Sequence, residues 1–288
     1  MERKIKKKKI SPGFKIPASL LVSAKALQFI SKDLAAVFLG KIFATPPRFK
    51  TPEREKMMEK SAKSEIFRID SIRKDIKVYT YGFSKQKVLL AHGWSGRGTQ
   101  LYNLADKILE NRMMVISLDA PAHGSSTGKM TNMLEYLETL KFIDQKFGPF
   151  HAAIGHSWGG MTLLMAVANG LRTEKLVSIG ADDKISEVLI SFVKKFELKP
   201  VIAKKIKEFY DKRLKRNIDE FSSTRSAEKV SIPTLVIHDT KDQFVPVSSA
   251  YRIRQSLKKG TILVTHGLGH HKIFKDPAVI QKIINFIK

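Results

Sequence analysis

The sequence predicts an α/β protein whose mostly parallel sheet is covered by helices on both faces. Short apolar runs of strand length alternate along the chain with longer runs of helical period. The 288 residues, of which 43% are hydrophobic, suffice for one sizeable core. Several of the short runs end in polar or glycine-rich loops, and the carboxyl ends of parallel strands are where such a fold places its site. We therefore expect a single α/β domain with additions.

The predicted elements follow one another in order from residue 76. Strands are expected at residues 76–81, 88–91, 113–118, 152–154, 175–180, 234–238 and 261–264. Helices are expected from about residue 99, and at 131–147, 161–168, 247–257 and 277–287. Because helical segments separate the strands along the chain, parallel pairing is favoured over hairpins.

Two segments interrupt this alternation. Roughly fifty residues separate the strands predicted at 175–180 and 234–238, which is too many for a simple crossover, and apolar residues recur there at helical spacing. We expect a small helical cap over residues 182–230, whose apolar stripe either packs on the main domain or lines a substrate pocket. Residues 1–60 read as a basic helical extension, and residues 61–288 as the domain that carries the cap.

The N-terminal extension has two interpretations. It begins with the basic run at residues 3–9 and continues with an apolar stretch over 17–44 that charged residues interrupt. No run reaches the ~18 apolar residues that cross a bilayer, and Lys25 breaks the candidate signal peptide. We expect helices packed on the domain; the alternative is a peripheral membrane contact in which the lysines meet anionic lipid. The expected location is cytoplasmic, with membrane association left open.

The charge and the missing residue types exclude several classes of function. The chain has 52 Lys and Arg against 27 Asp and Glu, a formal charge of +25, but the positive residues are mostly dispersed lysines. Base recognition relies on arginine forks and aromatic platforms, so no specific nucleic-acid partner is expected. Without cysteine there are no disulfides or thiolate metal sites. Neither dinucleotide nor phosphate glycine loops occur, so no cofactor and no metal are expected.

The segment at residues 155–160, Gly-His-Ser-Trp-Gly-Gly, is the most informative in the chain. It follows an apolar run and opens a helical one. Glycines on both sides of Ser157 leave room for a tight turn that presents the serine oxygen at the sheet edge. The next amide lies at a helix N-terminus, which favours the negative charge that develops on an attacked carbonyl oxygen. This motif predicts a nucleophile only if its partners are present, because G-x-S-x-G alone is a weak signal.

Two downstream loops supply the partners that a serine nucleophile needs. Asp242 lies on the loop after the strand at 234–238, and the loop after 261–264 is rich in glycine and histidine. A serine hydroxyl requires a base to take its proton and an acid to orient that base. The order Ser, Asp, His, each just past a predicted strand, is that of the nucleophile-elbow hydrolases.

With these motifs the chain resembles the α/β-hydrolase superfamily, and its serine esterases and lipases in particular, from about Ser64 to the C-terminus. Residues 89–94 are similar to the family's strand and oxyanion loop. Residues 119–126 are similar to its D-x-P-G-H-G-x-S turn, with Ala122 in place of glycine. The resemblance implies a triad and an oxyanion hole formed by two backbone N–H groups: Ser157, Asp242 and His270, with Trp94 and Trp158.

Some assignments stay open. Asp239 is either a turn-forming residue or the acid itself, although spacing favours Asp242. The side chains of Trp94 and Trp158 either line an acyl pocket or pack in the core. His92 and His156 are expected to bond to the backbone or to pack, whereas His266 and His271 are expected to be loop or surface residues.

The sequence thus predicts a serine hydrolase that cleaves ester or thioester bonds of small molecules through an acyl-enzyme. Peptidase, thioesterase and lipase chemistry remain open, because one fold hosts many reactions. The alternative function is non-catalytic: a protein of the same fold that binds a membrane surface or a partner through its basic N-terminal segment.

Overall fold

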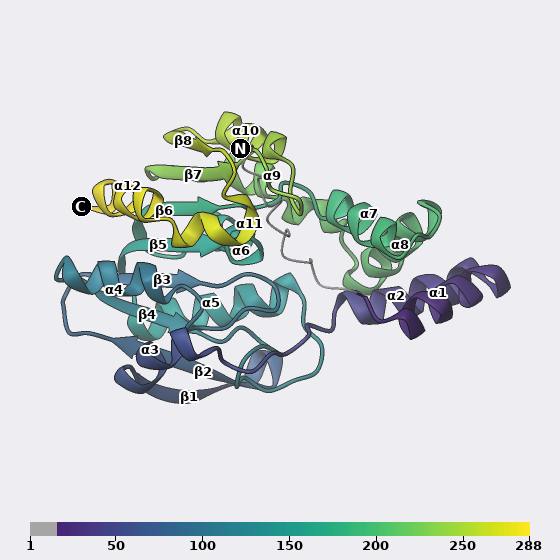
Figure 1. Ribbon diagram of the computed structural model, residues 1–288, viewed down its shortest axis with the longest axis horizontal. Coiled ribbons are helices and arrows are strands. Elements are labelled where there is room, and N and C mark those ends of the chain that lie inside the picture. The colour runs from purple at the N-terminus through teal and green to yellow at the C-terminus, as the bar shows by residue number, and fades with distance from the viewer. Residues whose placement is uncertain (1–15) are drawn as a thin grey trace, which may run out of the picture.

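The structure, a computed structural model, describes residues 16–288 and contains one eight-stranded sheet (Figure 1). The strands are β1 (Lys63–Ile69), β2 (Lys74–Tyr81), β3 (Lys87–Ala91), β4 (Met114–Leu118), β5 (Phe150–His156), β6 (Thr173–Ile179), β7 (Thr234–Asp239) and β8 (Gly260–Thr265). Their order across the sheet is β1-β2-β4-β3-β5-β6-β7-β8. The pairs β1–β2 and β2–β4 are antiparallel and all others are parallel. The predicted mostly parallel sheet is confirmed.

Helices cover both faces of this sheet and also extend beyond one end of it (Figure 1). They are α1 (Ala18–Ile30), α2 (Lys32–Phe43), α3 (Lys56–Ser61), α4 (Tyr102–Glu110), α5 (Met133–Phe147), α6 (Trp158–Ala168), α7 (Ile185–Lys195), α8 (Val201–Leu214), α9 (Ser223–Ala227), α10 (Val247–Ser256), α11 (Gly269–Lys272) and α12 (Pro277–Ile287). Short 3-10 helices are η1 (Glu53–Glu55), η2 (Asp70–Ile72), η3 (Ile218–Phe221) and η4 (Ile273–Lys275).

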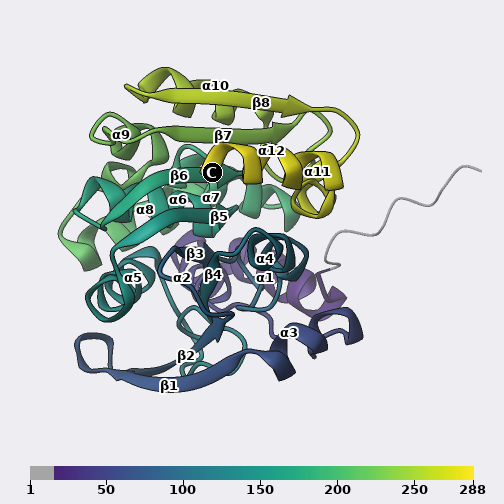
Figure 2. The ribbon, with the colours of Figure 1, turned by 90° about the vertical axis from the view of Figure 1, so that its left-hand side faces the viewer.

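Two separate cores form because the central strands are apolar on both faces. On one face α4 and α12 contribute Leu104 and Ile283; on the other, α5 and α6 contribute Leu140 and Leu163. Figure 2 shows the strands succeeding one another from β8 to β1, with α4 and α12 on one side and α5 on the other. This sandwich of layers is the arrangement that parallel strands require.

One strand and several boundaries differ from the sequence-based expectations. Strand β1 was not predicted, because its side chains alternate between exposed and half-buried and most of them are polar or charged. At the edge of the sheet it has a single neighbouring strand, so it needs little apolar surface.

The helix predicted at 131–147 begins at Met133, where the side chain of Asn132 accepts hydrogen bonds from the amides of Leu134 and Glu135 and so caps it.

We use the name cap for residues 182–230. Helices α1 and α2 pack on its helices α7 and α8 (Figure 1). The buried face of α2 includes Ala36, Leu39 and Gly40, and the hydroxyl of Tyr210 on α8 donates to the carbonyl of Gly40 at 2.9 Å. The extension therefore packs on the rest of the chain, α1 and α2 on the cap and α3 beside β2. Residues 3–9, the basic run, lie outside the described residues. Within residues 16–288, no helix has the length and apolar character needed to span a bilayer.

The segment after α2 connects the cap to the loops at the carboxyl ends of the strands. The guanidinium of Arg48 donates to the carbonyls of Ala122 and Ser126, at 3.0 and 2.7 Å. Ala122, which stands where the family pattern has glycine, holds a left-handed conformation with φ 65°. The N-terminal extension thus contacts the loops that surround Ser157.

Candidate active site

Ser157 occupies a sharp turn between β5 and α6. Its backbone has φ 54° and ψ −120°, a conformation that non-glycine residues rarely adopt. Both flanking glycines are required by contact: a Cβ on Gly155 would meet the backbone of Gly159 at 2.6 Å, and one on Gly159 would lie 2.3 Å from the carbonyl oxygen of Ala91. The predicted elbow geometry is thus present, and its glycines are explained by close approach of the backbone.

The structure brings Ser157, His270 and Asp242 into one chain of hydrogen bonds. His270 Nε2 lies 3.0 Å from Ser157 Oγ, and His270 Nδ1 lies 2.6 Å from Asp242 Oδ2. The second carboxylate oxygen of Asp242 accepts from the amides of Phe244 and Val245, at 2.8 and 3.0 Å. Burial opposes ionisation of Asp242, but the hydrogen bond from His270 and the two amides hold its pKa below the usual value. An ionised Asp242 fixes the proton on Nδ1 and leaves Nε2 free to accept.

Asp239 does not contact His270. Its carboxylate accepts from the Thr265 hydroxyl at 2.7 Å and from the amide of Leu268 at 3.0 Å. Burial would raise the pKa of Asp239, but these bonds outweigh it and lower the pKa to about 2. Asp239 therefore fixes the loop that carries His270, while Asp242 is the carboxylate that bonds to the imidazole.

Two of the other histidines bond to the backbone beside the site, as expected. His156 Nε2 lies 2.9 Å from the carbonyl oxygen of His270, and burial lowers the His156 pKa well below its usual value. His92 Nε2 accepts from the amide of Ala120 at 2.9 Å, and its Nδ1 lies 2.7 Å from the carbonyl of Gly93. Burial lowers the pKa of His92 to about 4, so it is a neutral link between two loops.

The remaining two histidines of the motifs lie in the loop around His270. His266 Nδ1 is 2.7 Å from the Thr240 hydroxyl, and the rings of His271 and Phe244 are 5.2 Å apart. Neither is bonded to Ser157 or Asp242. Both are exposed, which agrees with the expectation of loop or surface residues.

His238 is a group that the sequence analysis missed. It lies at the end of β7, fully buried, where its Nε2 donates to the carbonyl of Val245 at 3.0 Å and lies 3.5 Å from Asp242 Oδ2. It therefore holds the loop after β7 that carries Asp242. Its only signal in the sequence is a histidine at the end of an otherwise apolar strand.

The loop after β3 lies directly against the nucleophile. A Cβ on Gly93 would be 3.0 Å from the Cβ of Ser157, so glycine is needed for this approach. Trp94 follows in the loop, and Trp158 begins α6. Within the part of the chain that the structure describes, the backbone N–H groups of these two tryptophans donate no hydrogen bond to another group of the protein. Two unpaired amide donors are thus available next to Ser157.

Buried polar contacts hold this loop in place. The amide of Gly98 donates to Asp119 Oδ1 at 2.7 Å. Glu55, which is only 3% exposed, accepts at 3.0 Å from both the Arg97 guanidinium and the Thr99 hydroxyl. Sequence reasoning missed Glu55, because it lies about forty residues before its partners in a segment without a motif.

Aromatic rings join the site to the cap and the N-terminal helices. The rings of Trp94 and Trp158 are 5.1 Å apart. Phe43, the last residue of α2, stacks on Trp94 at 6.4 Å and contacts Phe192 of α7 at 5.2 Å. The two tryptophan side chains therefore lie half-buried in one aromatic cluster, with cap and extension supplying the outer members.

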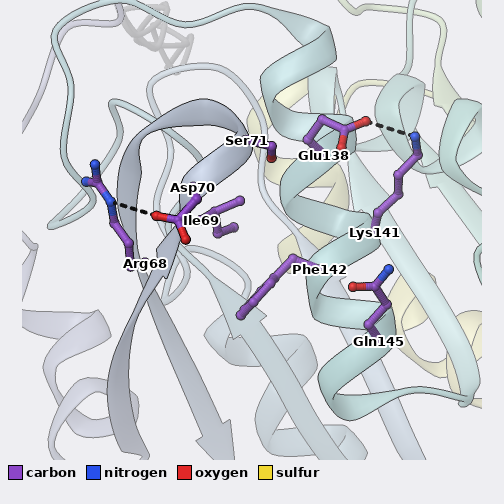
Figure 3. Close-up of a pocket in the computed structure, with 8 residues that line it drawn as sticks. All are labelled: Arg68, Ile69, Asp70, Ser71, Glu138, Lys141, Phe142 and Gln145. Carbon is purple, nitrogen blue, oxygen red and sulfur yellow. Dashed lines mark hydrogen bonds and ion pairs between the residues drawn. The ribbon is translucent and has the colours of Figure 1, made fainter.

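A shallow cavity of about 270 Å³ lies elsewhere, between η2 and α5 (Figure 3). It is lined by Arg68, Ile69, Asp70, Ser71, Glu138, Lys141, Phe142 and Gln145. None of the groups around Ser157 belongs to this lining. Within residues 16–288, no group of three or more His, Asp or Glu side chains is placed to hold a metal ion.

Comparison with known proteins agrees with the observed fold. Residues 87–212 match a family model described as alpha/beta hydrolase fold, and residues 215–288 match one described as TAP-like protein. No curated protein is similar enough in sequence to match the chain.

Three solved structures illustrate the likeness in fold. The esterase Pf2001 of Pyrococcus furiosus is 17% identical with a TM-score of 0.66, over 84% of this chain and 98% of that one. The esterase EaEST of Exiguobacterium antarcticum is 17% identical with a TM-score of 0.62, over 78% and 99%. A bacterial membrane phospholipase A is 16% identical with a TM-score of 0.62, over 93% and 95%. At these identities the likeness concerns the fold.

Proposed function

Because the chain belongs to the α/β-hydrolase superfamily, we propose that it is a serine hydrolase that cleaves carboxylic ester or thioester bonds of small molecules. The observation that carries this proposal is the hydrogen-bonded chain Asp242–His270–Ser157 at a strained turn. Strain at one residue persists only where the surrounding structure enforces it, which is typical of functional sites.

The proposed reaction has two steps. Ser157 Oγ attacks the carbonyl carbon while His270 Nε2 takes its proton, and the negative charge of Asp242 stabilises the imidazolium. The resulting oxyanion accepts hydrogen bonds from the N–H groups of Trp94 and Trp158. His270 then returns the proton to the leaving alcohol or thiol. A water deprotonated by His270 attacks the acyl-enzyme, and the acid is released as the proton returns to Ser157.

Ester substrates are favoured over other acyl compounds by two observations. The structural neighbours include two esterases and a phospholipase. The aromatic cluster around Trp94 and Trp158 offers apolar surface beside the nucleophile, which suits an acyl chain more than a charged peptide.

A series of p-nitrophenyl esters from acetate to palmitate tests the proposal. The unmodified protein should hydrolyse part of the series, and Ser157→Ala should lower kcat by roughly 10⁴-fold or more. Ser64→Ala, an exposed serine on edge strand β1, serves as the matched control and should leave the rate unchanged. The chain-length optimum then indicates the size of the acyl site.

The alternative is a non-catalytic protein that contacts a membrane surface or a partner through its basic N-terminal segment, of which residues 1–15 lie outside the described part of the chain. The net charge of +25 supports such a contact. If no ester is hydrolysed and a fluorophosphonate fails to label Ser157 in the folded protein, the hydrolase proposal is wrong and this alternative takes its place.

A further inference from the structure

Helix α1 carries apolar side chains both toward the cap and toward solvent, interrupted by Ser19, Ser23, Lys25 and Gln28. The inner face packs on the cap and includes Leu20, Ala24 and Leu27. The opposite face exposes Val22 by 67% and Phe29 by 94%. Since α1 is the outermost element at its end of the molecule (Figure 1), its outer face calls for a covering partner.

The exposed apolar side chains continue into α2. The chain turns at Ser31, whose hydroxyl accepts from the amides of Asp33 and Leu34 and so starts the new helix. On either side of this turn, Ile30 is 72% and Leu34 is 52% exposed. We define the docking face as Val22, Phe29, Ile30, Leu34 and Val37. Exposed apolar groups concentrated in this way mark interaction surfaces.

The charge around the docking face selects the class of partner. Among residues 16–50, five are basic and one is acidic. Lys32 and Lys41 are exposed, and among the described residues neither forms a salt bridge. Two copies of this chain would bring like charges together at such a surface, whereas an anionic bilayer complements them.

We propose that the docking face binds the surface of an anionic phospholipid bilayer. Phe29, Ile30 and their neighbours enter the boundary between headgroups and acyl chains, while lysines such as Lys32 contact lipid phosphates. No part of α1 or α2 crosses the bilayer in this arrangement. Docking does not require catalysis and so stands independently of the proposed hydrolase activity.

The docking face lies close to the candidate site, so a bilayer bound there would also lie close to that site. Helix α2 begins within this face and ends at Phe43, whose ring stacks on Trp94. With a rise of about 1.5 Å per residue, Leu34 and Phe43 are roughly 14 Å apart along the helix axis. A bilayer that holds α1 and α2 is therefore close to the aromatic cluster beside Ser157.

Vesicle binding by the full-length protein tests the proposal. Flotation with phosphatidylcholine vesicles containing 30% phosphatidylglycerol should recover the protein, and pure phosphatidylcholine vesicles should recover much less. The double substitution Phe29→Ser with Ile30→Ser should lower the partition coefficient about tenfold or more, since it removes two buried apolar side chains from the bound state. Both residues are exposed, so the substitutions spare the fold.

Two controls separate the outcomes. Phe83→Ser changes another fully exposed phenylalanine, between β2 and β3, and should bind vesicles like the unmodified protein. Ser157→Ala should also bind normally, so a failure of catalysis and a failure of docking are distinct. Equal binding by the Phe29/Ile30 variant overturns the proposal. So does a concentration-dependent dimer that this variant abolishes without any effect on vesicle binding, because the face is then a contact between copies.

Discussion

At the scale of single residues, the two aspartates near the end of β7 have different tasks. Asp242 contacts His270, whereas Asp239 accepts from the side chain of Thr265 and from backbone amides of its own loop and the histidine loop. Sequence spacing favoured Asp242 and left Asp239 as either a turn-forming residue or the acid; its bond from the amide of Lys241 fits the turn-forming role. The structure assigns Asp239 a role that is open to measurement through pH, because its bonds lower the pKa to about 2.

Asp239→Asn should destabilise the protein at neutral pH by about 1–2 kcal/mol. A carboxyl whose pKa is lower in the folded state stabilises that state above its ordinary pKa, near 3.9, and loses this contribution as the pH falls toward 2. Urea unfolding measures the free energy of unfolding of the unmodified protein and of Asp239→Asn. The difference between these two values should be constant from pH 7 to 5 and should become smaller below pH 4. Asp70→Asn, which changes a carboxylate that is 94% exposed, should show a much smaller difference. A pH-independent difference for Asp239→Asn would contradict the assignment.

At the scale of elements, the loop after β3 is held by a residue from the N-terminal extension. Glu55 in η1 pairs with Arg97, and both side chains are largely buried, with 4% and 11% of their surface exposed. Removing one partner of a buried pair leaves the other charge unsatisfied and displaces what it held. The group that this pair holds in position is the backbone N–H of Trp94, three residues before Arg97.

Glu55→Gln should lower kcat for ester hydrolysis about tenfold while KM changes little, because the misplaced donor serves the oxyanion and not the bound ester. Glu53→Gln is the matched control, since Glu53 lies in the same 3-10 helix with its side chain 84% exposed. A structural defect alone would instead reduce the fraction of folded enzyme, which active-site titration measures. If Glu55→Gln raises KM and leaves kcat unchanged, Glu55 does not position the donor.

The same elements show how far the sequence carries prediction. Ser157, Asp242 and His270 could be named because each lies in a short local motif after a strand, and the strand order brings the three together. Glu55 and Phe43 could not, since their partners in the β3 loop depend on how the extension folds back over the cap. Strand β1 could not be predicted, because an edge strand needs no continuous apolar run.

At the scale of the whole molecule, the net charge of +25 is an unfavourable term in folding. Among the described residues, many salt bridges join exposed side chains, and such pairs contribute little each. We therefore expect repulsion among the surplus lysines to outweigh local attraction. Salt screens charges over about 10 Å at 0.1 M, so it relieves long-range repulsion before it weakens contacts at 3 Å.

The melting temperature should accordingly rise by several degrees between 0.02 and 0.3 M sodium chloride at pH 7, in contrast to proteins held together by their surface ion pairs. Differential scanning calorimetry at several scan rates measures the shift and checks that it is not kinetic. A sucrose series of equal osmolality is the control for effects unrelated to charge. A melting temperature that falls with salt would mean that the short ion pairs, such as the one between Arg97 and Glu55, dominate the electrostatic energy. The repulsion argument would then fail, while the geometry around Ser157 would be unaffected.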